Sequence, residues 1–152
     1  MRLRSNKGFT LIELLIVVAI IGIIAAIAIP NLLNAIQRGK QKRSMADMRS
    51  IGTAVESYQV DNGYPPGCGN SSDLRGVMSN YLEPTFIRTL PAQDAWKFNF
   101  QIAQSVDEYT IISYGKNRST DGCVAGTLTK NFNNDICYSN GQYSQYPDGT
   151  QQ

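Results

Sequence analysis

The side chains that could do chemistry are few in this chain of 152 residues. There is no histidine, so the chain cannot build a histidine-based catalytic relay or metal site. The three cysteines, Cys68, Cys123 and Cys137, form no CxxC pair of the kind that zinc ribbons and thioredoxins use. No serine or cysteine lies beside a plausible base, and no paired carboxylates stand out. The sequence therefore predicts a protein that is not an enzyme.

Two of the cysteines, Cys123 and Cys137, flank the stretch VAGTLTKNFNNDI. A disulfide between them would close a loop of about 15 residues and stabilise the fold by about 3 kcal/mol in the chain-entropy model. Such a bond indicates an oxidising compartment. Two alternatives stay open: Cys68 pairs with one of the two, or all three cysteines are reduced.

The same region is rich in oxygen ligands, the kind that Ca²⁺ binds six to eight at a time. Asp121, Asn133 and Asp135 are the candidate calcium ligands. Their spacing matches no EF-hand, and the alternative is that they are solvated turn residues.

A further carboxylate, Glu13, lies near the start of a long apolar run. From Phe9 to Ile29 the chain is apolar except for Thr10 and Glu13. As a helix this run would be about 30 Å long, the thickness of a hydrocarbon core. A charge at the centre of a membrane costs about 3 kcal/mol, so Glu13 needs a partner there. The run predicts a single membrane anchor.

A secretory signal peptide is the alternative explanation of this segment. Its basic n-region would hold Arg2, Arg4 and Lys7, and 26–28 would be its Ala-Ile-Ala cleavage site. The apolar run is longer than the usual h-region of about 7–15 residues, which favours the anchor.

The string KGFTLIEL, residues 7–14, resembles the processing site of class III prepilins, the precursors of type IV pilins and type II secretion pseudopilins. The resemblance implies cleavage between Gly8 and Phe9 by a prepilin peptidase, followed by N-methylation of Phe9. It also implies that Glu13 takes part in assembly, where we expect it to pair with the Phe9 amine of an adjacent subunit.

Two further positions of the anchor match the same family. Gly22 and Pro30 fall where the family carries a glycine and a helix-loosening proline. Since proline removes an intrahelical donor and clashes one turn back, we expect the helix to kink or loosen between them.

The C-terminal part is similar to two members of the family. LPAQDAWKFNFQI and DEYTIISYGKN resemble the major pseudopilin of type II secretion, in which a calcium-binding loop follows. Here Ala95 separates Asp94 from Trp96, and Lys97 replaces a glycine. The loop between cysteines instead resembles that of type IV major pilins.

The resemblance and the residue pattern predict one α+β, pilin-like architecture. Residues 1–8 form a leader, 9–62 a long helix with 9–30 as its transmembrane or filament-core part, and 63–152 a globular head. An apolar face recurs on the second half of the helix at three- and four-residue spacing, through Met45, Met48, Ile51, Val55 and Tyr58. The head is expected to pack a small antiparallel sheet on this face.

Local patterns predict the elements of the head. SSDLRGVMSNYLEP indicates a short helix capped by Ser72 or Asp73, and KFNFQI indicates a half-buried strand. DEYTIISYG is expected to pair with that strand, and Asn140-Gly141 to form a two-residue hairpin turn.

We expect a structural filament subunit, with the type II secretion pseudopilus favoured. A major type IV pilin of a surface pilus and a minor tip pilin are the alternatives. The implied partners are other copies of the chain, prepilin peptidase/methyltransferase, an assembly platform with its ATPase, minor pilins and the lipid bilayer. The implied location is the bacterial inner membrane, with the head in the periplasm. The net charge of +2 gives no reason to expect nucleic-acid binding.

The basic band from Arg38 to Arg43 has two interpretations. It is either solvated or facing lipid headgroups, or it contacts acidic groups of neighbouring subunits, for which Asp47, Glu56 and Asp61 are candidates.

Overall fold

The computed structural model describes residues 8–67, 72–105 and 108–149. Its elements in chain order are α1 (Leu11–Asn62), β1 (Ser72–Asp73), α2 (Leu74–Leu82), β2 (Gln101–Gln104), β3 (Tyr109–Ser113), β4 (Thr127–Thr129), β5 (Ile136–Ser139) and β6 (Gln142–Pro147). A long N-terminal helix and a small, mostly antiparallel sheet confirm the predicted α+β, pilin-like fold class. The chain divides into two units, which meet between Ile36 and Gln37.

The first unit is the apolar first half of α1. From Phe9 to Ile36 its large apolar side chains are 45% to 87% exposed. Among the described residues, α1 is the helix that is long and apolar enough to cross a membrane. It continues through Pro30 without interruption, so loosening between Gly22 and Pro30 stays a prediction.

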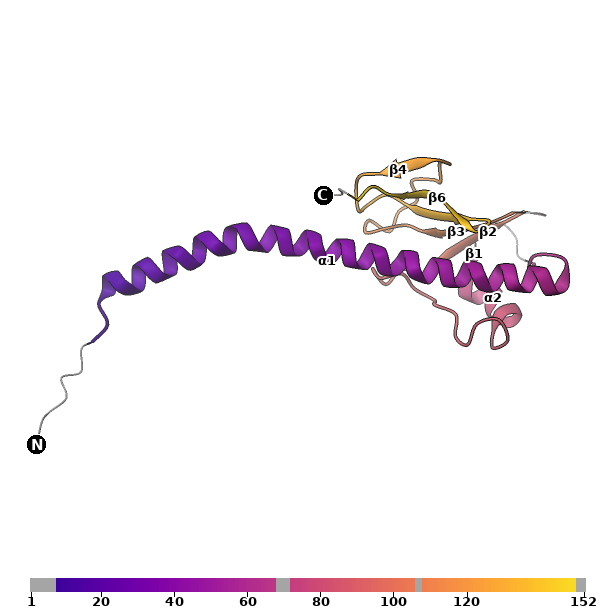
Figure 1. The fold of residues 1–152 in the computed structure, drawn as a ribbon, viewed down its shortest axis with the longest axis horizontal. Helices are drawn as coiled ribbons and strands as arrows, with labels where there is room; N and C mark the ends of the chain where they lie inside the picture. Colours follow the sequence, from indigo (N-terminus) through magenta and orange to yellow (C-terminus); the bar gives the residue numbers. More distant parts are fainter. Residues whose placement is uncertain (1–7, 68–71, 106–107, 150–152) are drawn as a thin grey trace, which may run out of the picture. The chain divides into compact units, whose positions relative to one another are not determined.

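The second unit contains the rest of α1 and the whole described head (Figure 1). The compact unit therefore begins within the helix, at Gln37, because the later part of α1 supplies one wall of the core. Met48, Ile51, Val55 and Tyr58 are buried, and Met45 packs against the same core at its edge, which confirms the predicted apolar face.

Six strands form one sheet in the order β1-β2-β3-β5-β6-β4. All neighbouring pairs are antiparallel except β4 and β6, which run parallel. β2 and β3 pair antiparallel as predicted, with Ile102 opposite Ile111. β2 itself begins at Gln101, so residues 97–100 of the predicted strand lie before it. Asn140 and Gly141 join β5 to β6 with φ of 45° and 84°, as a tight hairpin turn requires.

The short helix α2 differs from its prediction at the N-terminus. Asp73 occupies the N-cap position, yet its side chain makes no capping hydrogen bond. The apolar face of α2 is formed by Leu74, Met78 and Leu82, while Tyr81 is 41% exposed. The core rather than a cap therefore fixes this helix.

The sheet approaches α1 closely at Gly52. A Cβ at this position would overlap the buried ring of Tyr138 and lie 3.1 Å from the hydroxyl oxygen of Tyr109. Tyr109 donates a 2.7 Å hydrogen bond to Glu56, one turn further along α1. Because Gly52 has no side chain, the helix and strands β3 and β5 can approach one another this closely.

We predict that Gly52→Ala lowers the free energy of unfolding of the head by about 1–3 kcal/mol, because two buried aromatic side chains must move. Gly39→Ala is the matched control, since a Cβ there meets nothing within 4 Å. In the same helix it should raise that free energy by about 0.5–1 kcal/mol. Urea titration followed by the fluorescence of Trp96, the single tryptophan, measures both. Equal effects of the two variants would show that the contact at Gly52 is unimportant.

Candidate functional sites

The predicted cleavage site lies just before α1. Gly8, Phe9 and Thr10 are exposed and precede the first helical residue, Leu11. A Cβ on Gly8 would meet nothing within 4 Å. The Gly8–Phe9 bond therefore lies in a short non-helical stretch with open surroundings, which is the form of backbone that a peptidase can bind.

Glu13 has a partner at the N-terminus of its own helix, Thr10, which the sequence analysis does not predict. The backbone N–H and the hydroxyl of Thr10 donate to Oε2 of Glu13 at 2.9 and 2.6 Å. The N–H of Glu13 donates to Thr10 Oγ1 at 3.3 Å. This reciprocal pair is a capping box, and the T-x-x-E spacing of residues 10–13 is the sequence signal that predicts it. The carboxylate thus stabilises the N-terminus of α1 before any second chain is involved.

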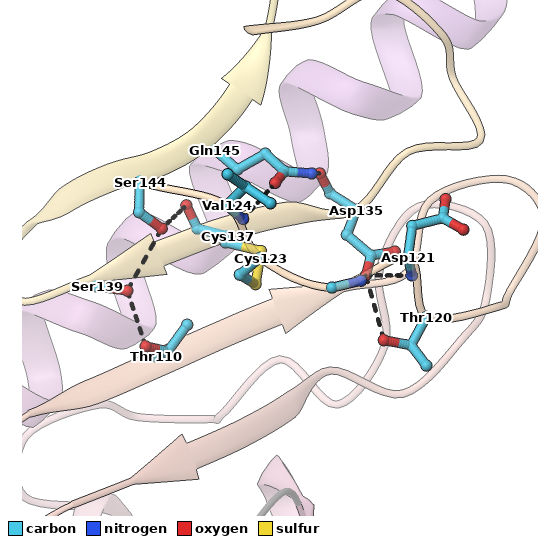
Figure 2. The surroundings of a disulfide bond; sticks show 11 residues. Thr110, Thr120, Asp121, Cys123, Val124, Asp135, Cys137, Ser139, Ser144 and Gln145 are labelled. Atoms are coloured by element: carbon cyan, nitrogen blue, oxygen red, sulfur yellow. Dashed lines mark hydrogen bonds between the residues drawn. A yellow bond between two sulfur atoms is a disulfide. The ribbon is translucent and has the colours of Figure 1, made fainter. Parts of the chain in front are cut away.

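The disulfide joins Cys123 to Cys137 of β5, with 6.0 Å between their Cα atoms (Figure 2). This confirms the predicted pairing of these two cysteines. Cys68 lies outside the described residues. The bond ties the loop that precedes β4 to the centre of the sheet.

Asp135, fully buried next to β5, holds the same loop by hydrogen bonds (Figure 2). Its Oδ2 accepts from the backbone N–H groups of Asp121 and Gly122 at 2.9 and 3.1 Å, and from the Thr120 hydroxyl at 3.5 Å. Burial raises the pKa of Asp135, and the two backbone donors partly oppose that rise. The loop is thus fixed covalently and by a buried carboxylate.

Gln145 of β6 continues this network. Its Oε1 accepts from the N–H of Val124 at 2.7 Å, and its Nε2 donates to the carbonyl of Asp135 at 3.0 Å. Each end of one buried amide therefore satisfies a backbone group that the loop would otherwise bury unpaired.

The predicted calcium ligands are only partly brought together. Asp121 presents its backbone amide to Asp135, while Asn133 is exposed and its N–H donates to Asn131. Oδ1 of Asp135 is buried without a hydrogen-bond partner, so one oxygen is available. Calcium takes six to eight, and among the described residues no three Asp, Glu, Cys or His side chains are grouped to hold a metal. As arranged, these side chains do not form a calcium site, and calcium binding stays a prediction from the sequence.

A second buried carboxylate, Asp94, organises the loop that carries Trp96. Its Oδ1 accepts from the backbone N–H groups of Trp96 and Phe98, both at 2.9 Å, and Oδ2 accepts from the Ser113 hydroxyl at 2.8 Å. The indole of Trp96 in turn donates to Gln37 of α1 at 2.8 Å. Asp94 therefore places the tryptophan against the helix at the point where the head begins.

Lys97, where the resembling sequences have glycine, has a φ of 64°. A left-handed backbone conformation favours glycine, which explains why the resemblance leads us to expect glycine at position 97. The turn keeps its shape in this chain because Asp94 accepts the amides on both sides of Lys97.

Comparison with known proteins agrees with these features. Residues 3–29 match the prokaryotic N-terminal methylation motif, and residues 31–131 match the model of type II secretion system protein G. The chain belongs to the type II secretion system protein G family. No solved structure matches it at a significant level.

Three relatives show the range of this similarity. Type II secretion system core protein G of Vibrio cholerae is 30% identical, over 72% of this chain and 79% of that protein. The protein of the same name from Escherichia coli K12 is 26% identical, over 80% and 82%. The type IV major fimbrial protein FimA of Dichelobacter nodosus is 33% identical, over 74% of each chain.

We predict that reducing the Cys123–Cys137 bond, or replacing both cysteines by serine, lowers the free energy of unfolding of the head by about 3 kcal/mol, because the unfolded loop regains its freedom. Cys68→Ser is the matched control. It should leave the free energy of unfolding unchanged, and dithiothreitol should lower that free energy as much as it does in the wild type. Trp96 fluorescence in urea measures each. A loss of stability with EGTA, and none with dithiothreitol, would contradict this assignment and favour calcium.

Proposed function

We propose that this chain is the major subunit of the pseudopilus of type II protein secretion, a filament built from many copies. The observation that carries the proposal is the first half of α1, whose large apolar side chains are 45% to 87% exposed. Apolar surface of this extent is stable only in lipid or against similar helices. The membership of the protein G family supports the choice of machine.

The proposed pathway begins with a precursor in the inner membrane, anchored once and with its head in the periplasm. The disulfide supports that placement, because such bonds persist in oxidising compartments. Prepilin peptidase cleaves between Gly8 and Phe9 and N-methylates the new terminus. An assembly platform with its ATPase then moves subunits from the bilayer into the filament, where minor pilins are further partners.

Glu13 gives this transfer its specificity in our proposal. Exchanging lipid for other apolar helices yields little free energy, so polar contacts must select the arrangement. Both donors of Thr10 use Oε2, which leaves Oε1 of Glu13 for a second partner. Cleavage creates that partner, the Phe9 amine, which we place on an adjacent subunit.

Gly22 and Pro30 have a supporting role in the proposal. Both residues lie in the first unit, and a Cβ on Gly22 would have nothing within 4 Å. Glycine weakens a helix by roughly 1 kcal/mol relative to alanine, and proline removes a hydrogen bond. We propose that α1 loosens between these residues when a subunit leaves the bilayer.

A surface pilus is the second candidate, and the fimbrial relative from Dichelobacter nodosus favours it. Electron microscopy of filaments sheared from cells separates the two. Filaments released at native expression levels indicate a pilus, whereas filaments retained in the periplasm indicate a pseudopilus.

We predict that the mature chain begins at N-methylated Phe9 and that Gly8→Val blocks processing, because a side chain at Gly8 hinders entry into the peptidase site. Mass spectrometry of membrane fractions measures both. Gly39→Ala, which alters the same helix far from the cleavage site, is expected to be processed normally. A mature chain that begins at Ile29 would instead show a signal peptide.

We predict that Glu13→Gln and Glu13→Ala both lower filament yield by roughly tenfold or more, since a lost charge-assisted contact costs about 1.5–3 kcal/mol. Glutamine keeps the capping contact with Thr10 but carries no charge, so it separates the two roles of Glu13. Sheared filaments quantified by immunoblot measure the yield. Normal assembly of the Gln variant would show that only the cap matters.

A further inference from the structure

Basic side chains gather where the head begins, immediately after the apolar first half of α1. Some lie on α1 itself, and others lie on loops that contact it. We call this set the basic collar, and its members are Arg38, Lys40, Lys42, Arg43, Lys97 and Arg118. All are exposed except Lys40, which is partly exposed. Neither the cleavage site, the Glu13 cap nor the disulfide-bonded loop uses this charge.

The loop members of the collar are held against α1 by hydrogen bonds. The backbone N–H of Ala95 donates to Ser44 Oγ of the helix at 3.0 Å. The guanidinium of Arg118 donates to the carbonyl of Trp96 at 3.3 Å, and Lys97 is the next residue along that loop. Lys97 and Arg118 therefore lie beside the first turns of α1 in the head, next to the basic residues of the helix.

The helical members of the collar point to different sides of α1. Arg38 and Lys42 are four residues apart and share one side, whereas Lys40 lies about 200° around the helix from Arg38. Arg43 lies about 100° from Lys42 and is 3.9 Å from Asp47, which offsets part of its charge. A protein partner covers one face of a helix, but a membrane surface surrounds a helix that crosses it. The distribution therefore favours a surface that encircles α1.

The collar also follows the apolar run at the distance that a bilayer sets. Large apolar side chains continue from Phe9 to Ile36, and a helix of that length would be about 40 Å long. A bilayer with its headgroup regions is about 40–45 Å thick. Arg38 comes two residues after Ile36. Lipid phosphates are therefore the anions that this position meets when the run lies in a membrane.

A groove of about 250 Å³ gives one such phosphate a defined place. Arg38 and Asp148 each already make an interaction within the chain, which fixes two of its walls. Lys42 is exposed and forms no ion pair with the described residues. A phosphate ester fits this set, since its charge meets the two cations and a hydroxyl of a glycerol headgroup can donate to Asp148. The full lining is Arg38, Gln41, Lys42, Met45, Pro147, Asp148 and Gly149.

We propose that the basic collar binds the phosphate groups of anionic phospholipids in the leaflet on the side of the head. One headgroup lies in the groove beside Arg38 and Lys42. The proposal rests on the membrane anchoring in the function proposed above and names the ligand of the anchored subunit. A subunit that leaves the bilayer gives up these contacts, so the collar keeps the head at the membrane surface until assembly.

The experiment uses the full-length chain, reconstituted in vesicles of phosphatidylcholine that also contain phosphatidylglycerol. A photo-crosslinking residue replaces Gly39, where a Cβ meets nothing within 4 Å. Mass spectrometry should show lipid adducts in which phosphatidylglycerol exceeds its share of the bilayer. Arg38→Glu combined with Lys42→Glu should lower the phosphatidylglycerol adduct by about fivefold or more, because cations near an anionic surface attract its lipids.

The same helix and a second helix supply the controls. Ser57 is exposed and lies on the same side of α1 as Gly39, about five turns or 27 Å further along, so a crosslinker there should give no lipid adduct. Arg75→Glu reverses an exposed charge on α2 and should leave the adduct at Gly39 within about twofold, because distant surface charges are screened. Trp96 fluorescence in urea shows that each variant is folded.

Three results would overturn the proposal. Adducts in proportion to lipid abundance, unchanged by the Arg38 and Lys42 reversals, would show that the collar is near the membrane without binding phosphate. A crosslink from position 39 to a second copy instead of lipid would assign the collar to a contact between subunits. In both cases membrane anchoring stands. A wild-type chain that an alkaline carbonate wash removes from the vesicles would refute the anchoring and the lipid contact together.

Discussion

The structure depends on one constraint: the apolar first half of α1 is covered by nothing in the part of the chain that the structure describes. A soluble helix buries one stripe and exposes the other, as α1 does from Gln41 to Tyr58. The first half is apolar on all sides, so one packing face cannot satisfy it. Lipid and a bundle of like helices are the two environments that can, and a subunit that passes from one to the other needs a head that folds independently of both.

The head meets that requirement with buried polar contacts at one end of its sheet, where Ser113 of β3 pairs with Ile136 of β5. Asp94 accepts two backbone amides and a hydroxyl where the Trp96 loop meets α1. Asp135 accepts two backbone amides and a hydroxyl in the disulfide-bonded loop. In each case the carboxylate accepts backbone N–H groups that no strand or helix pairs. This matters because a buried N–H without an acceptor costs about 1–3 kcal/mol. These two carboxylates therefore have a structural role, because their hydrogen bonds hold the loops against the sheet.

Much of this fold could be predicted because its signals are local. The apolar spacing from Met48 to Tyr58, the Asn140-Gly141 turn and the β2–β3 pair each depend on residues close in sequence. The parallel strand β4 was not predicted, because it has three residues, two of them exposed, and its partner β6 lies beyond β5. The capping role of Asp73 was wrong because packing of Leu74 and Met78 fixes α2 without it.

The candidate sites show the same division. The cleavage motif can be predicted because it is a contiguous string. The disulfide can be predicted because three cysteines allow few pairings. The buried network of Asp135 and Gln145 depends on which loop folds over which strand, and no spacing reveals that. The Thr10–Glu13 cap has a local signal, the T-x-x-E spacing, so it can be predicted from the sequence.

That cap changes the physical problem that Glu13 poses. A bare carboxylate in a bilayer costs about 3 kcal/mol on insertion scales, yet this one accepts two hydrogen bonds and lies at a helix N-terminus, where the dipole favours negative charge. The precursor can therefore carry Glu13 in the membrane before cleavage. An amine released at Phe9 then adds a charge-assisted contact to a carboxylate that is already oriented, so little side-chain entropy is lost when it binds. The cap therefore holds Glu13, while it lies in the membrane, in the conformation that the proposed pairing uses.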